Sequence, residues 1–124
     1  MLSLGGMAAG LSLTRGVAAI NSADEVVRDG IRRQRVLRLT YRGHSRLVEP
    51  HAIGITTGGH RALLAWQAEG GSKSDPPTGW RTFITSEIKA PIVTVQGFSP
   101  RDTYRRENVT LRVELDVLGD SSSD

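Results

Sequence analysis

Four cationic side chains on the predicted strands could together bind an anion. They are Arg46, His51, Arg61 and Arg81, one or two from each of three predicted strands. If those strands are neighbours, the guanidinium and imidazole groups can converge on one concave surface and hold an anion through charge-assisted hydrogen bonds. Cations scattered along strands can equally be ordinary surface residues, so both interpretations stay open at this point.

The other polar residues match no catalytic or metal-binding motif. His44, His51 and His60 are seven and nine residues apart, which fits no short helical metal motif. The chain has no nucleophile elbow, phosphate-binding glycine loop or paired-carboxylate signal. We therefore expect a protein that is not an enzyme, with no catalytic residue, no metal ligand and no cofactor.

Two tryptophans offer aromatic rings for stacking. Trp66 and Trp80 could stack on bases, as aromatic side chains do in proteins that bind single-stranded nucleic acid. Trp66 ends the apolar run that begins at Ala62, so packing in the core is the alternative for this side chain.

Length and composition fit one small domain. The chain has 124 residues, enough for one modest core, and a formal charge of +3. It has no cysteine, which is compatible with a reducing cytoplasm. We expect a cytoplasmic protein with a single domain.

Positive charge gathers in one stretch of the chain. Residues 28–46 contain seven arginines against one aspartate. This asymmetry permits an anionic partner such as nucleic acid, and a solvated helix face is the alternative. We expect Arg28, Arg32 and Arg35 to be mostly solvated, with water and nearby acids as partners, and not to form the principal site.

The first twenty residues do not predict a membrane anchor. They are weakly apolar, contain four glycines and carry no positive charge before Arg15. A transmembrane helix needs about 20 mostly apolar residues, and a secretory signal needs a cationic start. We expect residues 1–20 to be a flexible extension and expect no membrane partner.

A helix is predicted after this extension. Ser22 and Glu25 have the spacing of a capping box, in which the two side chains satisfy exposed backbone amides reciprocally. The helix should run to about Gln34, with Val27 and Ile31 on its apolar face.

The rest of the chain predicts strands and turns. Apolar residues alternate or run together in short segments bounded by Gly, Pro and polar residues. Gly58 and Gly59 predict a hairpin turn. Pro50 lacks a backbone donor and indicates an edge position or a bulge, while 62–66 is the best candidate for the central strand. The expected strands are residues 36–41, 46–55, 61–67, 80–85, 92–95 and 109–117.

The last predicted strand raises the question of a partner. From Val109 to Val117 every second residue is apolar, so one face should be buried. We expect this strand to mediate a homodimer or to dock on another protein, because an unpaired edge is a template for strand pairing. The alternative is that it completes the sheet of its own chain.

Between residues 31 and 88 the chain resembles the WYL domain, a ligand-sensing module often attached to bacterial winged-helix regulators. The resemblance rests on Val36-Leu37-Arg38-Leu39-Thr40-Tyr41-Arg42-Gly43, Arg46-Leu47-Val48-Glu49-Pro50-His51, the Gly-Gly turn and Trp80-Arg81-Thr82-Phe83. At the Trp-Tyr-Leu signature this chain has Arg61-Ala62-Leu63, and Ile84 and Glu87 stand at two basic positions of the family.

This resemblance implies a fold and a function. The fold would be mainly β, a small Sm-like or SH3-like β-barrel preceded by one α-helix. The chain would then divide into the extension 1–20, a WYL-like domain 21–96, a C-terminal loop and strand 97–118 and a disordered tail 119–124. Arg46, His51 and Arg81 would surround the binding surface, and Arg61 carries over less directly because it replaces an aromatic residue of the family.

We therefore expect a non-enzymatic ligand-sensing module in bacterial transcription regulation. Its ligand would be anionic, a nucleotide or single-stranded nucleic acid. The alternative is a protein-interaction or oligomerisation module with an SH3-like scaffold and no small ligand.

Overall fold

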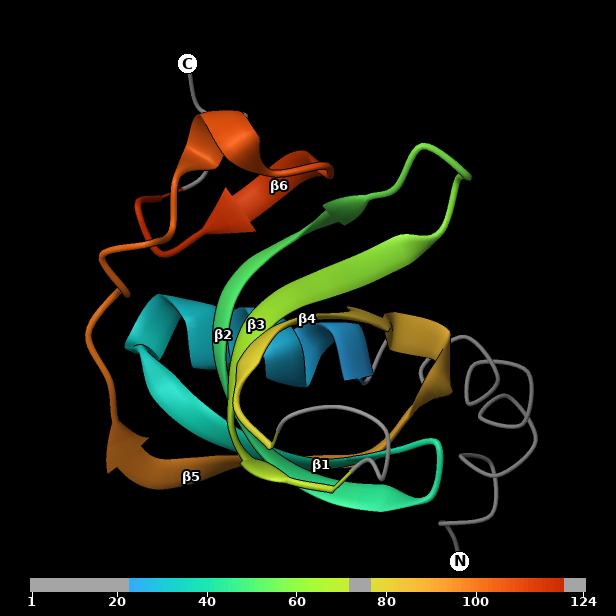
Figure 1. The fold of residues 1–124 in the computed structure, drawn as a ribbon, viewed down its shortest axis with the longest axis vertical. Helices are drawn as coiled ribbons and strands as arrows, with labels where there is room; N and C mark the ends of the chain where they lie inside the picture. The colour runs from blue at the N-terminus through green and yellow to red at the C-terminus, as the bar shows by residue number, and fades with distance from the viewer. Residues whose placement is uncertain (1–22, 72–76, 120–124) are drawn as a thin grey trace, which may run out of the picture.

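The computed structural model describes residues 23–71 and 77–119 and is mainly β. A helix over residues 23–33, called here the N-terminal helix, is followed by one antiparallel sheet (Figure 1). The strands are β1 (Arg35–Tyr41), β2 (His44–Ile55), β3 (Arg61–Gly70), β4 (Gly79–Ile84), β5 (Ile88–Gly97) and β6 (Arg112–Asp116), with short 3-10 turns η1 (Thr85–Glu87) and η2 (Arg106–Asn108). The predicted extension 1–20, the Ser22 cap, residues 72–76 between β3 and β4, and the tail beyond Gly119 lie outside the described residues.

The N-terminal helix forms where the sequence predicts it. Its apolar face places Val27 and Ile31 in the core, both essentially buried. These side chains pack with Leu37, Ile53 and Leu115 of the sheet. A short helix is marginal alone, so this burial is what holds it in place.

A two-residue turn joins β1 to β2 because its residues can adopt positive φ. Arg42 and Gly43 have φ of 51° and 82°, and Tyr41 pairs with His44. This is the left-handed geometry that matches the twist of paired strands. The turn is tighter than the four-residue turn expected at 42–45.

β2 is the central strand, and its neighbour changes halfway along. One edge of β2 pairs with β3. The other edge pairs with β1 over residues 44–48 and with β6 over residues 52–55. Pro50 lies at the change, beside a register shift between Pro50 and Ala52, which confirms the predicted bulge. The prediction that 62–66 is the central strand was wrong, because β3 is one place away from the middle of the sheet.

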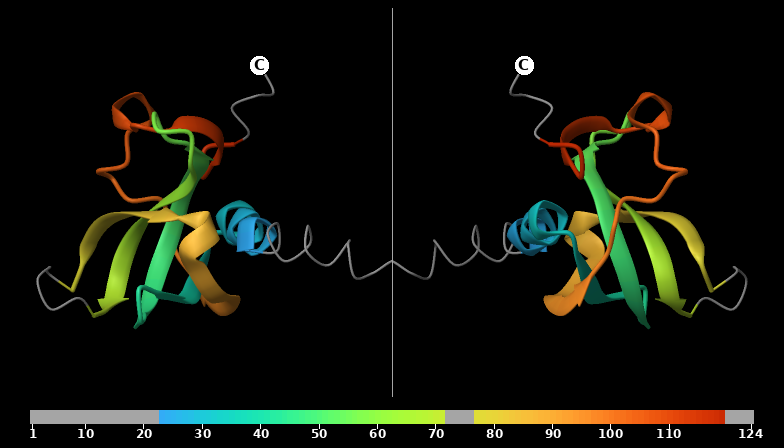
Figure 2. Two further views of the ribbon diagram at one scale, coloured as in Figure 1. Left: turned by 90° about the vertical axis from the view of Figure 1, so that its right-hand side faces the viewer. Right: turned by 90° about the vertical axis from the view of Figure 1, so that its left-hand side faces the viewer.

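The sheet curves strongly but does not close. Its order is β4-β3-β2-β1-β5, with β6 attached to β2, and no pairing between β4 and β5 is seen in the described residues. The mainly β class and the leading helix are confirmed, whereas the closed barrel is not observed. The Tyr41 hydroxyl of β1 accepts a hydrogen bond from the Ile84 N–H of β4 at 3.1 Å, so a side chain reaches across part of the gap. Figure 2 shows the curved sheet from its two sides.

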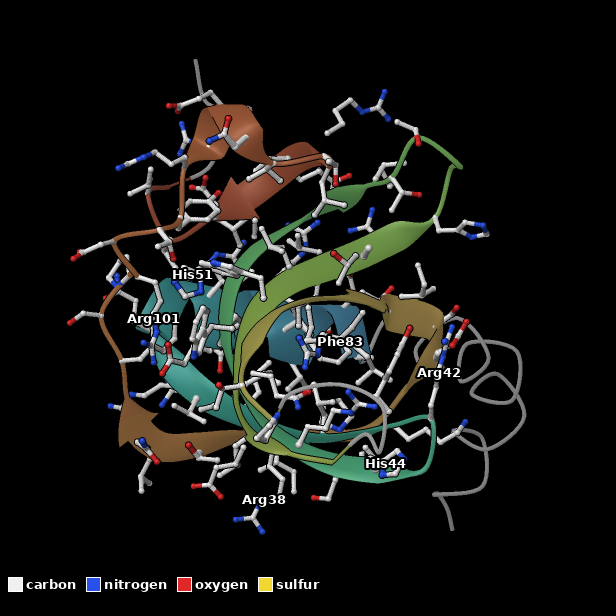
Figure 3. All side chains as sticks on the ribbon, viewed as in Figure 1. Arg38, Arg42, His44, His51, Phe83 and Arg101 are labelled. Carbon is white, nitrogen blue, oxygen red and sulfur yellow. The ribbon has the colours of Figure 1, made fainter. Side chains whose placement is uncertain are left out.

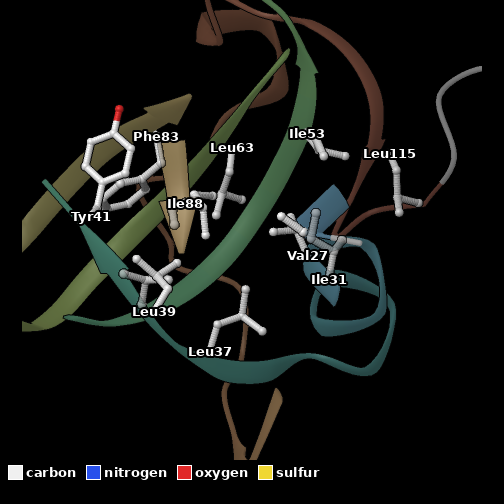
Figure 4. Packing of buried hydrophobic residues seen from close by; sticks show 13 residues of the cluster. Val27, Ile31, Leu37, Leu39, Tyr41, Ile53, Leu63, Phe83, Ile88 and Leu115 are labelled. Atoms are coloured by element: carbon white, nitrogen blue, oxygen red, sulfur yellow. The ribbon is translucent and has the colours of Figure 1, made fainter. Parts of the chain in front are cut away.

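The inner face of the sheet carries the hydrophobic core. Register places alternate side chains of β1 to β4 on this face, and they pack around Leu39, Leu63 and Phe83 (Figure 4). Tyr41 meets the Phe83 ring edge to face at 4.8 Å. Residues 98–119, called here the C-terminal segment, lie against the part of the outer face around His51 and Trp80 and then return to the sheet as β6.

The predicted strand at 109–117 lies within the sheet of its own chain. β6 is shorter than expected and pairs with β2. Leu111 and Leu115 are buried, and Val113 and Val117 are half-buried. The apolar face that motivated the dimer is thus covered intramolecularly, and β6 belongs to the same sheet as β1 to β5.

No helix within the described residues is long and apolar enough to cross a membrane.

Candidate functional site

The four predicted site residues do not share one surface. Arg46 pairs with Gly70 at one end of the β2–β3 ladder, and Arg61 pairs with Ile55 at the other end. His51 lies on the outer side of the sheet. Strand alternation already separates Arg46 from His51, since they are five residues apart and face opposite sides of a regular strand. Only Arg46 and Arg81 remain together.

Arg46 is built into the inner face. Arg46 is only 7% exposed. One guanidinium nitrogen donates to Gln67 Oε1 at 3.0 Å, and another donates to the Tyr41 carbonyl at 3.2 Å. The guanidinium carbon lies 5.5 Å from the centre of the Tyr41 ring and 5.6 Å from that of Phe83. Two aromatic faces and fixed acceptors therefore hold this cation in one orientation.

Arg81 lies on the same face, one strand further along. It is two residues from Phe83 on β4 and so shares the inner face with that ring, and its partner on β3 is Ala65. Arg81 Nη1 donates to the Trp80 carbonyl at 3.1 Å. Gln67, which accepts from Arg46, also donates to the Pro77 carbonyl at 3.0 Å beside the start of β4. We call this part of the inner face the concave end.

Further groups border the concave end. His44 is half-buried and pairs with Tyr41 at the rim of the sheet. Phe83 lies further toward the interior of the curved sheet (Figure 3). A groove of about 220 Å³ next to Arg46 lies on the other side of the sheet and is not part of the concave end. Arg38 and Leu47, which line it, are paired and alternate with inward-facing Leu39 and Arg46.

Arg61 instead belongs to an ion-pair network at the far end. Its guanidinium donates to Asp24 of the N-terminal helix and to Glu114 of β6, at 3.0 to 3.1 Å. Arg28 donates to the same two carboxylates. Hydrogen bonding from Arg61 and Arg28 outweighs partial burial and lowers the pKa of Glu114. Arg28 pairs with nearby acids as expected, but it is half-buried and not mostly solvated. Arg61 joins the N-terminal helix, β3 and β6.

The other two arginines of that prediction differ from Arg28. Arg32 is exposed, as expected. Arg35 is half-buried and donates to the Val95 carbonyl at 2.7 Å.

His51 is a buried, neutral imidazole. It is 0% exposed, and its Nδ1 lies 2.8 Å from the Glu49 carbonyl oxygen. A carbonyl oxygen only accepts, so Nδ1 carries the hydrogen. Nε2 then accepts from the backbone N–H of Arg101 at 3.0 Å. Burial lowers the pKa of His51, and the imidazole lies beside Arg101 of the C-terminal segment (Figure 3).

Aromatic rings surround His51 on the outer face. Trp80, Phe98 and Tyr104 lie within 4.8 to 5.4 Å of the imidazole centre. Trp66 meets Trp80 edge to face at 5.5 Å. The Arg101 guanidinium lies 4.6 Å from the Trp66 ring centre, so one face of the predicted stacking ring is already covered by a cation.

Sequence reasoning missed the polar anchors of the C-terminal segment. Arg101 pairs with the Glu49 carboxylate at 2.8 and 3.0 Å. Buried Asp116 accepts from the Tyr104 hydroxyl and from two nitrogens of Arg106, each at 2.7 Å. Burial of Asp116 opposes its ionisation, but these hydrogen bonds prevail and its pKa is lowered. No short-range pattern signals these pairs, since the Arg101 and Glu49 partners are far apart in sequence.

Among the described residues, no group of three or more His, Asp or Glu side chains is arranged to hold a metal ion. Comparisons with family models, with curated proteins and with solved structures found no match to this chain. The WYL relationship and the function that it implies therefore stay predictions.

Proposed function

We propose that the protein is a non-enzymatic regulatory module that binds an anionic ligand, a nucleotide or single-stranded nucleic acid, at the concave end. One observation carries the proposal: Arg46 and Arg81 project from different strands onto the same inner face, next to Gln67 and the Phe83 ring. A guanidinium presents a planar fork of donors that matches phosphate and carboxylate oxygens. Two of them from rigid strands provide the fixed geometry that anion recognition needs.

The wider relationship is part of the same proposal. We infer that this open sheet is related to the Sm-like and SH3-like barrels of WYL domains. In support, β4 and β5 are the two outermost strands of the sheet and yet follow each other in the chain, joined only by η1. The short connection brings the two edges of the sheet toward each other, as in a barrel. A role in sensing for bacterial transcription regulation would follow from that relationship.

Binding should be measured with the full chain, AMP and a labelled oligothymidylate at two salt concentrations. Phosphate contacts make affinity for the oligonucleotide fall steeply as salt rises. Arg81→Gln should weaken binding of both probes by about tenfold, since a charge-assisted hydrogen bond is typically of this strength. Arg112→Gln, a change of equal charge at an exposed position of β6, is the matched control. Equal affinities for the two variants would contradict the concave-end site.

A second candidate function is interaction with another protein or another copy of the chain through β5. Among the residues that the structure describes, this strand pairs only with β1 and only on one edge, and its Ile92 and Val95 are 56% and 91% exposed. Exposed apolar residues on an unpaired edge are typical of a strand-pairing surface. Sedimentation over a concentration series would show whether Val95→Lys removes self-association. A wild-type chain that stays monomeric at high concentration excludes the homodimer.

A further inference from the structure

A pocket on the outer face lies between the sheet and the C-terminal segment. Its volume is about 260 Å³. Leu64 of β3 and Val109 provide aliphatic walls, and Trp80 and Tyr104 provide aromatic ones. A cavity of about 150 Å³ is enough to bind one benzene ring, so this pocket has room for a ring system with a substituent.

The two aromatic walls are held in place by hydrogen bonds. Trp80 Nε1 donates to the Thr103 hydroxyl at 3.1 Å. The Tyr104 hydroxyl donates to buried Asp116 at 2.7 Å. The ring centres of Trp80 and Tyr104 are 6.2 Å apart with planes inclined at 45°. Fixed rings cost little entropy when a flat ligand packs against them.

The rim of the pocket carries two polar side chains. Arg105 precedes the 3-10 turn η2 and Asn108 is its last residue, and the Asn108 N–H donates to the Arg105 carbonyl at 3.0 Å. Both residues are exposed, and neither side chain makes a hydrogen bond or ion pair within the described part of the chain. A guanidinium and an amide at the mouth of an apolar pocket suit a carboxylate, which accepts from both.

The charges near the rim favour a ligand with one negative charge. Arg101 and Arg106 are paired with Glu49 and Asp116, while Asp102 and Glu107 are exposed on the same segment as Arg105. Their carboxylates repel a chain of phosphates but leave one guanidinium to pair with one anionic group.

We propose that this outer-face pocket binds a small planar aromatic carboxylate. Its ring would pack against the exposed surfaces of Trp80, Tyr104 and Leu64, and its carboxylate would meet Arg105 and Asn108. The site is separate from the concave end, so it does not depend on the proposed anion-binding function. It adds a ligand class that differs from nucleotides in both charge and size.

The test uses the full chain, 2-naphthoate and its uncharged analogue 2-naphthalenemethanol. Titration calorimetry gives the affinities, and NMR follows the two indole N–H resonances, assigned with Trp66→Phe. We expect naphthoate to shift the Trp80 resonance and to bind about tenfold more tightly than the alcohol, as one charge-assisted pair predicts. Arg105→Gln should remove that difference, whereas Arg112→Gln should keep it.

Three results would overturn the proposal. They are no binding of naphthoate at millimolar concentration, equal affinity for acid and alcohol, or an Arg105→Gln variant that still prefers the acid. Failure of the concave-end function is recognised separately, because it is measured with AMP and the oligonucleotide through Arg81→Gln.

Discussion

Gly54 of β2 lies directly against the backbone of Arg112 of β6. A Cβ atom built on Gly54 would be 2.1 Å from the Arg112 carbonyl oxygen and 2.8 Å from its carbonyl carbon. Such distances are far inside van der Waals contact, so only glycine allows the two strands to approach. This contact fixes the place where the C-terminal segment joins the central strand.

Gly54→Ala should therefore separate β6 from β2. We expect a loss of about 1–3 kcal/mol in the free energy of unfolding, the usual cost of overpacking a core. Urea unfolding measures it. The matched control is Gly58→Ala, where the nearest atom would be 3.5 Å away. Equal stability of the two variants would contradict the close approach.

Removal of the network arginine should destabilise the fold and leave ligand binding intact. Arg61→Ala deprives Asp24 and Glu114 of a shared partner, and we expect a loss of about 1–2 kcal/mol, above the range of an isolated surface pair. Arg112→Ala is the control, because Arg112 pairs with the same β2 residue, Ile55, but is exposed. A loss of AMP binding in the folded Arg61→Ala variant would instead return Arg61 to the ligand site.

The contribution of Glu114 to the free energy of unfolding should decrease as the pH is lowered. Its pKa is lowered in the folded state, so its ion pairs stabilise the fold above its unfolded value of about 4.3. That stability is lost as pH falls through the folded pKa. The difference in unfolding free energy between wild type and Arg61→Ala should therefore shrink below about pH 4.3. A difference that is constant down to pH 3 would be inconsistent with this linkage.

His51 should make the protein sensitive to mild acid. Its pKa is lowered in the folded state, so the unfolded chain takes up a proton first and stability falls as pH drops below the ordinary value of about 6.5. Protonation of Nε2 also removes the acceptor of the Arg101 N–H. Urea unfolding from pH 7.5 to 5.5 should show this slope in wild type and in His60→Gln, an exposed control. His51→Gln should be less stable at pH 7.5 but should lack the slope.

Truncation after Asn108 should unfold the chain. β6 provides buried Leu115 and pairs with residues 52–55 of β2, on the edge of β2 that is opposite β3. Burial of one leucine contributes about 1.5–3 kcal/mol, a large share of the stability of a small domain. Circular dichroism and urea unfolding of the truncated chain would show a missing or weakened transition. A folded, stable monomer would instead support the idea that β6 serves only a partner.

Local patterns determined most of the secondary structure. The helix around Val27 and Ile31, the alternating strands and the Gly58-Gly59 turn all follow from side-chain periodicity and backbone sterics, which act over a few residues. Pro50 correctly indicated a bulge, because its missing N–H has a local consequence. Strand ends were less predictable, and β5 and β6 differ most from their expected ranges, since pairing partners decide where a strand ends.

Tertiary structure alone decided which charges meet. The sequence presents Arg46, Arg61 and Arg81 as equivalent strand cations, yet register places Arg61 opposite Ile55 and within reach of Asp24 and Glu114. Coulomb attraction depends on distance in space. Asp24 and Glu114 are 37 and 53 positions away from Arg61 in the sequence, and they become its neighbours only when the helix, β3 and β6 pack together. The same packing leaves Arg46 and Arg81 on one inner face.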